Sequence, residues 1–214
     1  ATLVLLPFSN GLVKLACLTL PTHEDVKEMS ETDKTLSLLD PRFLDTPAYA
    51  VEQSRQVASV MADKSRKAMD LAMELLQGYD DAKAEQVAQM ETDVDRFEDE
   101  LGTYLVKLSS RQLSGKDSET LNTILHCIGD FERISDHARN VKEAAQEMYD
   151  KKLDFSDKAQ EELKVFERAV HDILDITMNS FIKGDLNLAR QVEPMEEVID
   201  GLSLDVKQRH VRRL

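Results

Sequence analysis

Residues 87–108 read VAQMETDVDRFEDELGTYLVKL, and the spacing of the apolar residues in this stretch decides the fold class. The apolar positions alternate steps of three and four without a break: Val87, Met90, Val94, Phe97, Leu101, Tyr104 and Leu108. Such steps keep side chains on one face of an α-helix, as in a helix that lies along its neighbours in a bundle. The stretch therefore predicts a long amphipathic helix.

Two further long helices are predicted on either side of this one. The first begins at Pro47, where Thr46 can act as the N-cap, and runs to about Gly78. The turn SSRQLSGKDS, residues 109–118, leads into a third helix whose pattern is lost near Tyr149. Long helices joined by short turns favour an up-down-up arrangement, so we expect residues 47–150 to form a three-helix bundle.

The same pattern returns later in the chain. Residues 67–95 align without gaps to residues 172–200, a shift of 105 positions, and nine of the 29 pairs are identical. An ungapped match that also aligns the turns indicates an internal duplication. The second copy, residues 151–214, contains helices from about Ser156 and from Leu186, and its third helix would fall after Leu214. The expected fold is all-α, with tandem up-down three-helix bundles, the second of which lacks its last helix.

Composition supports this fold class and limits the function. The 214 residues include only seven glycines and five prolines, which favours helix along most of the chain. A net charge of -14 argues against nucleic-acid binding, which needs clustered Lys and Arg. Cys17 and Cys127 lack the spacing of a thiolate metal site or a disulfide framework, so a reducing, cytoplasmic setting is expected.

The first 21 residues differ in character from the rest. They contain a single charge, Lys14, and are followed by the polar run THEDVKEMSETDK. Pro7 and Lys14 make the stretch a poor complete membrane span, so we interpret residues 1–21 as the end of a transmembrane helix or as an apolar junction. The alternative is an amphipathic helix packed on the soluble domain. Residues 22–46 are expected to be a linker.

Two pairs of carboxylates form the candidate site. Glu91 and Asp95 are four residues apart in one predicted helix, and Glu132 and Asp136 are four apart in the next, so each pair shares a helix face. If the turn is centred between residues 113 and 114, residues whose numbers sum to 227 lie at the same height, which places the two pairs opposite each other. Acidic pairs are also common on solvated helix faces. Four gathered carboxylates would repel one another unless some were protonated or a cation bound between them.

An all-oxygen ligand set suits magnesium, manganese, calcium or ferric iron, and suits zinc less well. The second copy repeats half of the site at Glu196 and Asp200. Catalysis is not expected, since Ser135, Asp136 and His137 are adjacent on a helix and point about 100° apart. The residues alone thus favour a protein that is not an enzyme, and they leave open whether the carboxylates bind a cation or form solvated helix faces.

The segment ERISDHARNV, residues 132–141, resembles the signature segment of the PhoU family, which usually reads ERIGDHAxNI. Ser135 stands where that family usually has Gly. The resemblance implies tandem three-helix bundles that bind metal clusters, with iron, manganese, magnesium or zinc as the cation. The ligands implied by position are Glu91, Asp95, Glu132 and Asp136 in the first bundle, and Glu196 and Asp200 as half of the second set.

A more specific likeness concerns the beginning of the chain. TLVLLPF, residues 2–8, and LLDPRFLDTPAYAVEQ, residues 38–53, resemble the junction between the last membrane helix and the PhoU domain of sodium-dependent phosphate cotransporters. This implies a regulatory domain on the cytoplasmic side of the cell membrane, whose partners are the attached transporter domain and phosphate-signalling proteins. The alternative is a free-standing PhoU-like adaptor that represses phosphate signalling, and the native sequence before Ala1 distinguishes the two. We also expect one more helix after Leu214 and, without it, an exposed apolar groove that a homodimer would cover.

Overall fold

A computed structural model describes residues 29–213, and the chain divides into two compact units, residues 1–34 and 35–214. The stretch interpreted as a membrane junction, residues 1–21, lies outside the described residues. In the described part of the first unit, the backbone N–H of Asp33 donates to Ser30 Oγ at 3.0 Å, at the start of helix α3 (Glu31–Leu36). Within residues 29–213, none of the helices combines the length and the apolar character that crossing a membrane requires.

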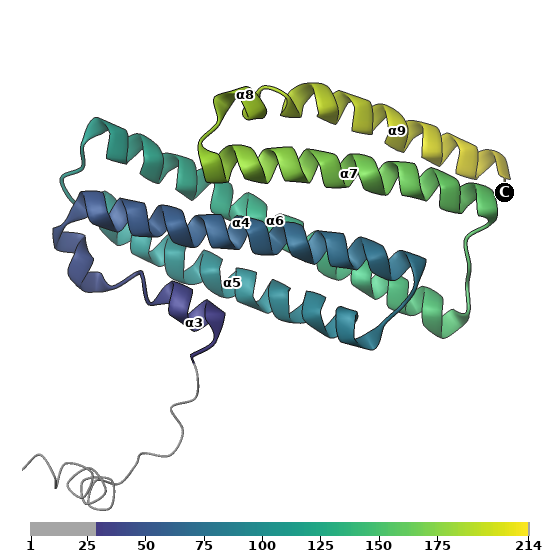
Figure 1. The fold of residues 1–214 in the computed structure, drawn as a ribbon, viewed down its shortest axis with the longest axis horizontal. Coiled ribbons are helices and arrows are strands. Elements are labelled where there is room, and N and C mark those ends of the chain that lie inside the picture. Colours follow the sequence, from purple (N-terminus) through teal and green to yellow (C-terminus); the bar gives the residue numbers. More distant parts are fainter. Residues whose placement is uncertain (1–28, 214) are drawn as a thin grey trace, which may run out of the picture. The chain divides into compact units, whose positions relative to one another are not determined.

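Three long helices form the first bundle, as the sequence predicted (Figure 1). They are α4 (Pro47–Gln77), α5 (Asp81–Ser109) and α6 (Gly115–Lys151), and each packs against the other two. The tight connections at residues 78–80 and 110–114 make neighbouring helices antiparallel. The all-α, up-down architecture is thereby confirmed for the described residues.

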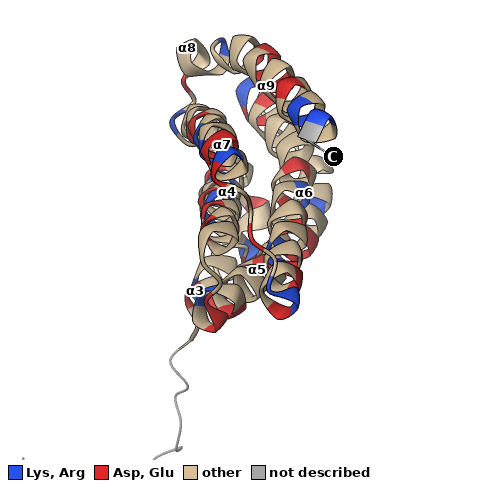
Figure 2. Cartoon of the chain, turned by 90° about the vertical axis from the view of Figure 1, so that its right-hand side faces the viewer, with Lys and Arg blue, Asp and Glu red and all other residues tan. Residues whose placement is uncertain are grey.

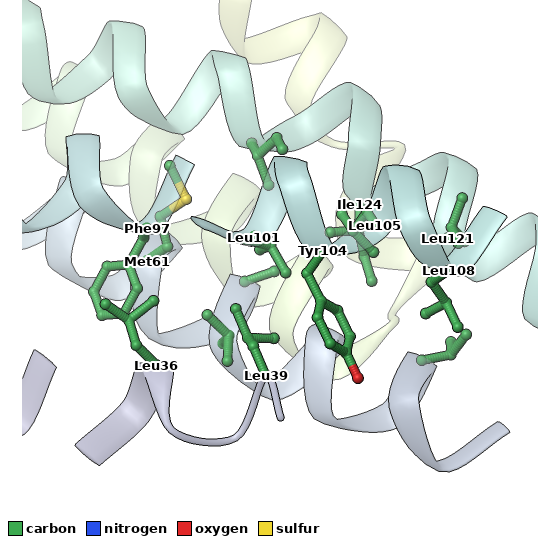
Figure 3. Close-up of a cluster of buried hydrophobic side chains, with 14 of the residues drawn as sticks. Leu36, Leu39, Met61, Phe97, Leu101, Tyr104, Leu105, Leu108, Leu121 and Ile124 are labelled. Carbon is green, nitrogen blue, oxygen red and sulfur yellow. The ribbon is translucent and has the colours of Figure 1, made fainter. Parts of the chain in front are cut away.

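The predicted seam of α5 forms the centre of the core. Of its seven apolar positions, all but Met90 are buried, and Phe97, Leu101 and Leu108 have no exposed surface. Figure 3 shows Phe97 beside Met61 of α4, and Leu105 beside Ile124 of α6. Removal of this much apolar surface from water is the main source of the bundle's stability.

The helix starts follow the expected chemistry in two of three cases. Asp80 caps α5 by accepting from the Lys83 N–H at 3.0 Å, and Ser114 caps α6 by accepting from the Asp117 N–H at 3.1 Å. Pro47 is the first residue of α4, as predicted, but the cap expected from Thr46 is wrong. Its hydroxyl donates instead to the Phe43 carbonyl at 3.1 Å, because a 3-10 helix, η2 (Pro41–Asp45), ends immediately before it.

Part of the segment expected to be a linker, residues 36–46, packs against the helices of the first bundle. Leu36, Leu39 and Leu44 are buried and belong to the same core as Met61 and Phe97. The Tyr104 hydroxyl of α5 donates to the Asp40 carbonyl at 3.2 Å, and Figure 3 shows Tyr104 directed toward this segment beside Leu39. Residues 36–46 therefore pack as part of the bundle.

The second copy forms a helical pair that packs on the first bundle. Helix α7 (Asp157–Lys183) contacts α4, and α9 (Val192–Arg213) contacts α7 (Figure 1). Asp185 caps the short α8 (Leu186–Ala189) just as its repeat partner Asp80 caps α5, which agrees with the duplication. The single helix expected from Leu186 is, however, interrupted between α8 and α9.

Helices α4 and α7 run antiparallel, and their interface contains both polar contacts and a buried apolar side chain. His171 Nδ1 lies 2.9 Å from Asp70 Oδ1, and Gln77 Nε2 donates to Glu167 Oε2 at 2.6 Å. The buried apolar side chain is that of Met178, which lies in the main core. In contrast, Val198, Leu204 and Val211 of α9 are each more than half exposed. The homodimer and the additional helix remain predictions.

Candidate functional site

The four predicted carboxylates lie on the facing helices α5 and α6. Glu91 and Asp95 are one helical turn apart on α5, and Glu132 and Asp136 are one turn apart on α6. Their environments differ: Glu91 is buried, Glu132 and Asp136 are partly exposed, and Asp95 is exposed. The site thus spans the boundary between the bundle interior and its surface.

A positive charge stands among these carboxylates. Arg139 forms an ion pair with Glu91 across the two helices, and its Nη2 lies 3.1 Å from Asp136 Oδ1 on its own helix. Arg139 was not among the site residues predicted from the sequence. The available signal was its position three residues after Asp136, a spacing that places two side chains on one helix face.

The contact made by Glu91 differs from the one expected from the hairpin. Helix α5 ends at Ser109 and α6 begins at Gly115. Glu91 pairs with Arg139, which lies three residues after Asp136 on α6, and the same guanidinium also reaches Asp136.

The remaining three carboxylates influence one another. Desolvation and the charge of Asp136 raise the pKa of Asp95 above its ordinary value. Desolvation and the charges of Asp136 and Asp95 raise the pKa of Glu132. Like charges and partial burial both disfavour the ionised form. Asp95, Glu132 and Asp136 therefore form an acidic cluster, which Arg139 neutralises in part.

The fit of a metal ion to this site depends on Arg139. In the described part of the chain, no group of three or more His, Cys, Asp or Glu side chains is arranged to hold a metal ion. All four predicted side chains are carboxylates, the donor type that hard cations prefer. The Arg139 side chain is 42% exposed and is paired with both Glu91 and Asp136, so a cation bound by these two carboxylates would have to displace it. The half-site on α9 has both carboxylates, Glu196 and Asp200, exposed.

The Ser135, Asp136 and His137 run does not form a catalytic arrangement. Ser135 is fully buried and His137 is exposed, as expected for neighbours on a helix. Ser135 Oγ has no hydrogen-bond partner within residues 29–213. The hydroxyl thus lies inside the bundle, next to the acidic cluster but not facing it.

Charges elsewhere are mixed. Figure 2 shows acidic and basic residues interspersed along the long helices, with no helix carrying one sign alone. The seam between α4 and α7 contains a second charged cluster in which Arg66 lies 3.1 Å from Asp70 and 3.9 Å from Asp175. In such a cluster each charge depends on its partners, because the loss of one partner leaves a partly buried charge uncompensated.

The fold and the site together define an all-α bundle with an acidic cluster between two antiparallel helices. The sequence model of the PhoU domain matches residues 58–145, which include most of α4, all of α5 and α6 as far as Ala145. The match contains all four carboxylates of the first bundle. Comparisons with curated proteins and with solved structures found no match. The match to this regulatory domain indicates a role in regulating phosphate homeostasis for the matched part of the chain.

Proposed function

We propose that this chain is the cytoplasmic PhoU-like regulatory domain of a sodium-dependent inorganic phosphate transporter in the cell membrane. It binds a metal cation and controls phosphate uptake through contacts with other protein segments, without catalysing a reaction. The observation that carries the proposal is the PhoU match over residues 58–145, the part of the chain in which α5 and α6 bring the acidic cluster together.

The packing of residues 36–46 supports attachment to a preceding membrane domain. This segment resembles a transporter junction in sequence, and Leu39 and Leu44 are buried in the core of the bundle. The hydrogen bond from Tyr104 to the Asp40 carbonyl adds a polar contact. A segment held in this way transmits displacement of the bundle to whatever precedes it, whereas a flexible linker would not.

The acidic cluster supports the metal component. In this proposal Glu91, Asp95, Glu132 and Asp136 bind iron, manganese or magnesium, with zinc less favoured, and Arg139 moves aside. The exposed Glu196 and Asp200 contribute half of a second site. Partner helices dock on the bundle, and metal occupancy changes the docking surface because it replaces the Arg139 ion pairs.

Phosphate uptake in the native host tests this proposal. The native gene is replaced by one carrying Asp95→Asn and Asp136→Asn, and sodium-dependent uptake of labelled phosphate is measured in phosphate-rich and phosphate-poor medium. Loss of the acidic cluster should change how strongly uptake falls in rich medium, at an equal amount of protein. The control is Asp130→Asn, because Asp130 is exposed on α6 and its ion pair with Arg133 is long at 3.9 Å.

The free-standing adaptor predicts a different result. In that case the double variant should alter the expression of phosphate-responsive genes and leave sodium-driven uptake per transporter unchanged. A double variant indistinguishable from wild type in both uptake and gene expression would refute both functions.

A further inference from the structure

A cavity of about 230 Å³ lies where the ends of α4 and α6 meet the beginning of α7, the right-hand end of the bundle in Figure 1. Leu76, Met148 and Leu163 contribute apolar walls. Tyr79 and Tyr149, which also line it, stack on each other with ring centroids 5.0 Å apart. The cavity is separate from the acidic cluster and plays no part in the function proposed above.

A buried carboxylate also lines this cavity. Glu167 of α7 is only 9% exposed, and its Oε2 accepts from Gln77 Nε2 at 2.6 Å. Its other oxygen, Oε1, is excluded from solvent and has no hydrogen-bond partner among residues 29–213. An unpaired buried carboxylate oxygen is energetically unfavourable, and buried polar groups normally have a partner. Desolvation accordingly raises the pKa of Glu167 above its ordinary value.

The surroundings of the cavity carry a negative field. Asp154 lines it, and the pKa of Tyr79 is raised by desolvation and, to a smaller extent, by the charges of Asp81 and Asp150. Lys164 is the basic residue of the lining, and it is exposed. A negative field and two aromatic rings are favourable to a cation and unfavourable to an anion.

We infer that this cavity binds a small organic cation, an apolar ring or chain that carries an ammonium group. The ammonium donates to the unpartnered oxygen of Glu167, which a rotation of the carboxylate about its soft terminal torsion presents to the cavity. The apolar frame packs against Leu76, Met148 and Leu163. Because an apolar cavity of about 150 Å³ accepts benzene, the present volume is sufficient for a ring with one added group.

The ligand would join elements of both copies of the repeat. The cavity is lined by α4 and α6 of the first bundle and by α7 of the second pair. Binding would therefore stabilise the docking of α7 by mass action.

Calorimetric titration of the whole 214-residue chain tests the inference, with benzylamine as the probe. Benzyl alcohol and benzoate have the same ring with a neutral and an anionic group. Benzylamine should bind. The affinity of both analogues should be lower by at least about tenfold, as expected when a charge-assisted hydrogen bond is lost. Glu167→Gln should reduce benzylamine affinity by a similar factor. Glu161→Gln is the matched control, because Glu161 is exposed on the same helix and does not line the cavity.

A second variant tests the inference independently in case Glu167→Gln does not fold. Tyr149 is 63% exposed, so Tyr149→Ala should fold normally and still weaken benzylamine binding severalfold. The nuclear magnetic resonance signals of the Tyr79 and Tyr149 rings should shift when benzylamine is added. The inference is overturned if benzylamine produces neither heat nor ring shifts up to about 10 mM, if benzyl alcohol binds equally well, or if neither substitution changes the affinity.

Discussion

Arg139 of α6 and Glu91 of α5 form an ion pair in which the Glu91 side chain is 9% exposed and the Arg139 side chain is 42% exposed. Arg139 also lies 3.1 Å from Asp136, so one guanidinium neutralises two of the four predicted metal ligands. A cation at this site must therefore compete with a charge that belongs to the protein itself.

Replacing Arg139 with Gln should destabilise the metal-free protein. The substitution leaves the buried Glu91 carboxylate without its counter-charge, and since Arg139 is partly exposed we expect a loss of about 1–2 kcal/mol, below the value for fully buried pairs. Urea unfolding in the presence of a chelator measures it. The control Arg133→Gln removes an exposed pair with Asp130 and should change the stability by less than about 0.5 kcal/mol.

The same variant also reports on the site. If a cation can take the place of Arg139, manganese should stabilise Arg139→Gln more than it stabilises wild type. Equal stabilisation of the two proteins, or none, would argue that the carboxylates do not share a cation.

Replacing Asp136 with Asn should affect stability only when metal is present. The amide keeps the shape and removes one charge, so metal binding weakens and the melting temperature in manganese or iron falls relative to wild type. In chelator the variant should be equally stable or slightly more stable, because the cluster that raises the pKa of Asp95 and Glu132 has lost one member. Melting curves of both proteins under both conditions measure this. Four unrelated surface carboxylates would produce no difference between the conditions.

The contact between His171 and Asp70 should make the docking of α7 on α4 depend on pH. The hydrogen bond to Asp70 raises the pKa of His171, with smaller contributions from the charges of Asp70, Asp172 and Asp175. A raised folded pKa means that the contribution to stability is complete below the ordinary value of about 6.5 and is lost as the pH rises through the folded value. Because His171 is half exposed, the contribution should stay below about 1 kcal/mol.

Urea unfolding of wild type and His171→Gln over a range of pH measures this contribution. The stability difference should be largest in acid and should shrink as the pH rises above 6.5. His126→Gln, at an exposed position on α6, is measured in parallel as the control substitution. An imidazole pKa of 6.5 or lower for His171 by nuclear magnetic resonance would contradict the prediction.

Replacing Ser135 with Ala should stabilise the protein. Ser135 Oγ is fully buried and has no hydrogen-bond partner among the described residues, so its removal eliminates an unfavourable desolvation. Ala is also the better helix former, and together these effects should amount to about 1 kcal/mol. Thermal and urea unfolding in chelator measure it, with Ser135→Gly as the comparison. Gly also removes the hydroxyl but weakens the helix, so Ser135→Ala should be the more stable of the two. A less stable Ser135→Ala would mean that the hydroxyl has a partner in solution.

Much of the fold could be predicted because helix periodicity is a local property. The steps of three and four along residues 87–108 identified the buried face of α5, and the second copy of the repeat predicted a helix from about Ser156, where α7 begins at Asp157. Predictions of helix ends from local sequence were less reliable where a neighbouring element took the same hydrogen-bonding group or interrupted the helix. The Thr46 hydroxyl bonds to η2, and the second copy's last helix breaks between Ala189 and Val192.

The sequence by itself determined the all-α class, the approximate extents of the three helices of the first bundle and the shared faces of Glu91 with Asp95 and of Glu132 with Asp136. All of these follow from hydrogen bonds and side-chain periodicity within one segment. Only the tertiary structure decided that Arg139 meets Glu91 and that Glu167 is buried without a full set of partners. The way in which α5 packs against α6 sets which charges meet, and the burial of Glu167 requires α7 to dock on α4. Both depend on packing between distant segments, which no local pattern encodes.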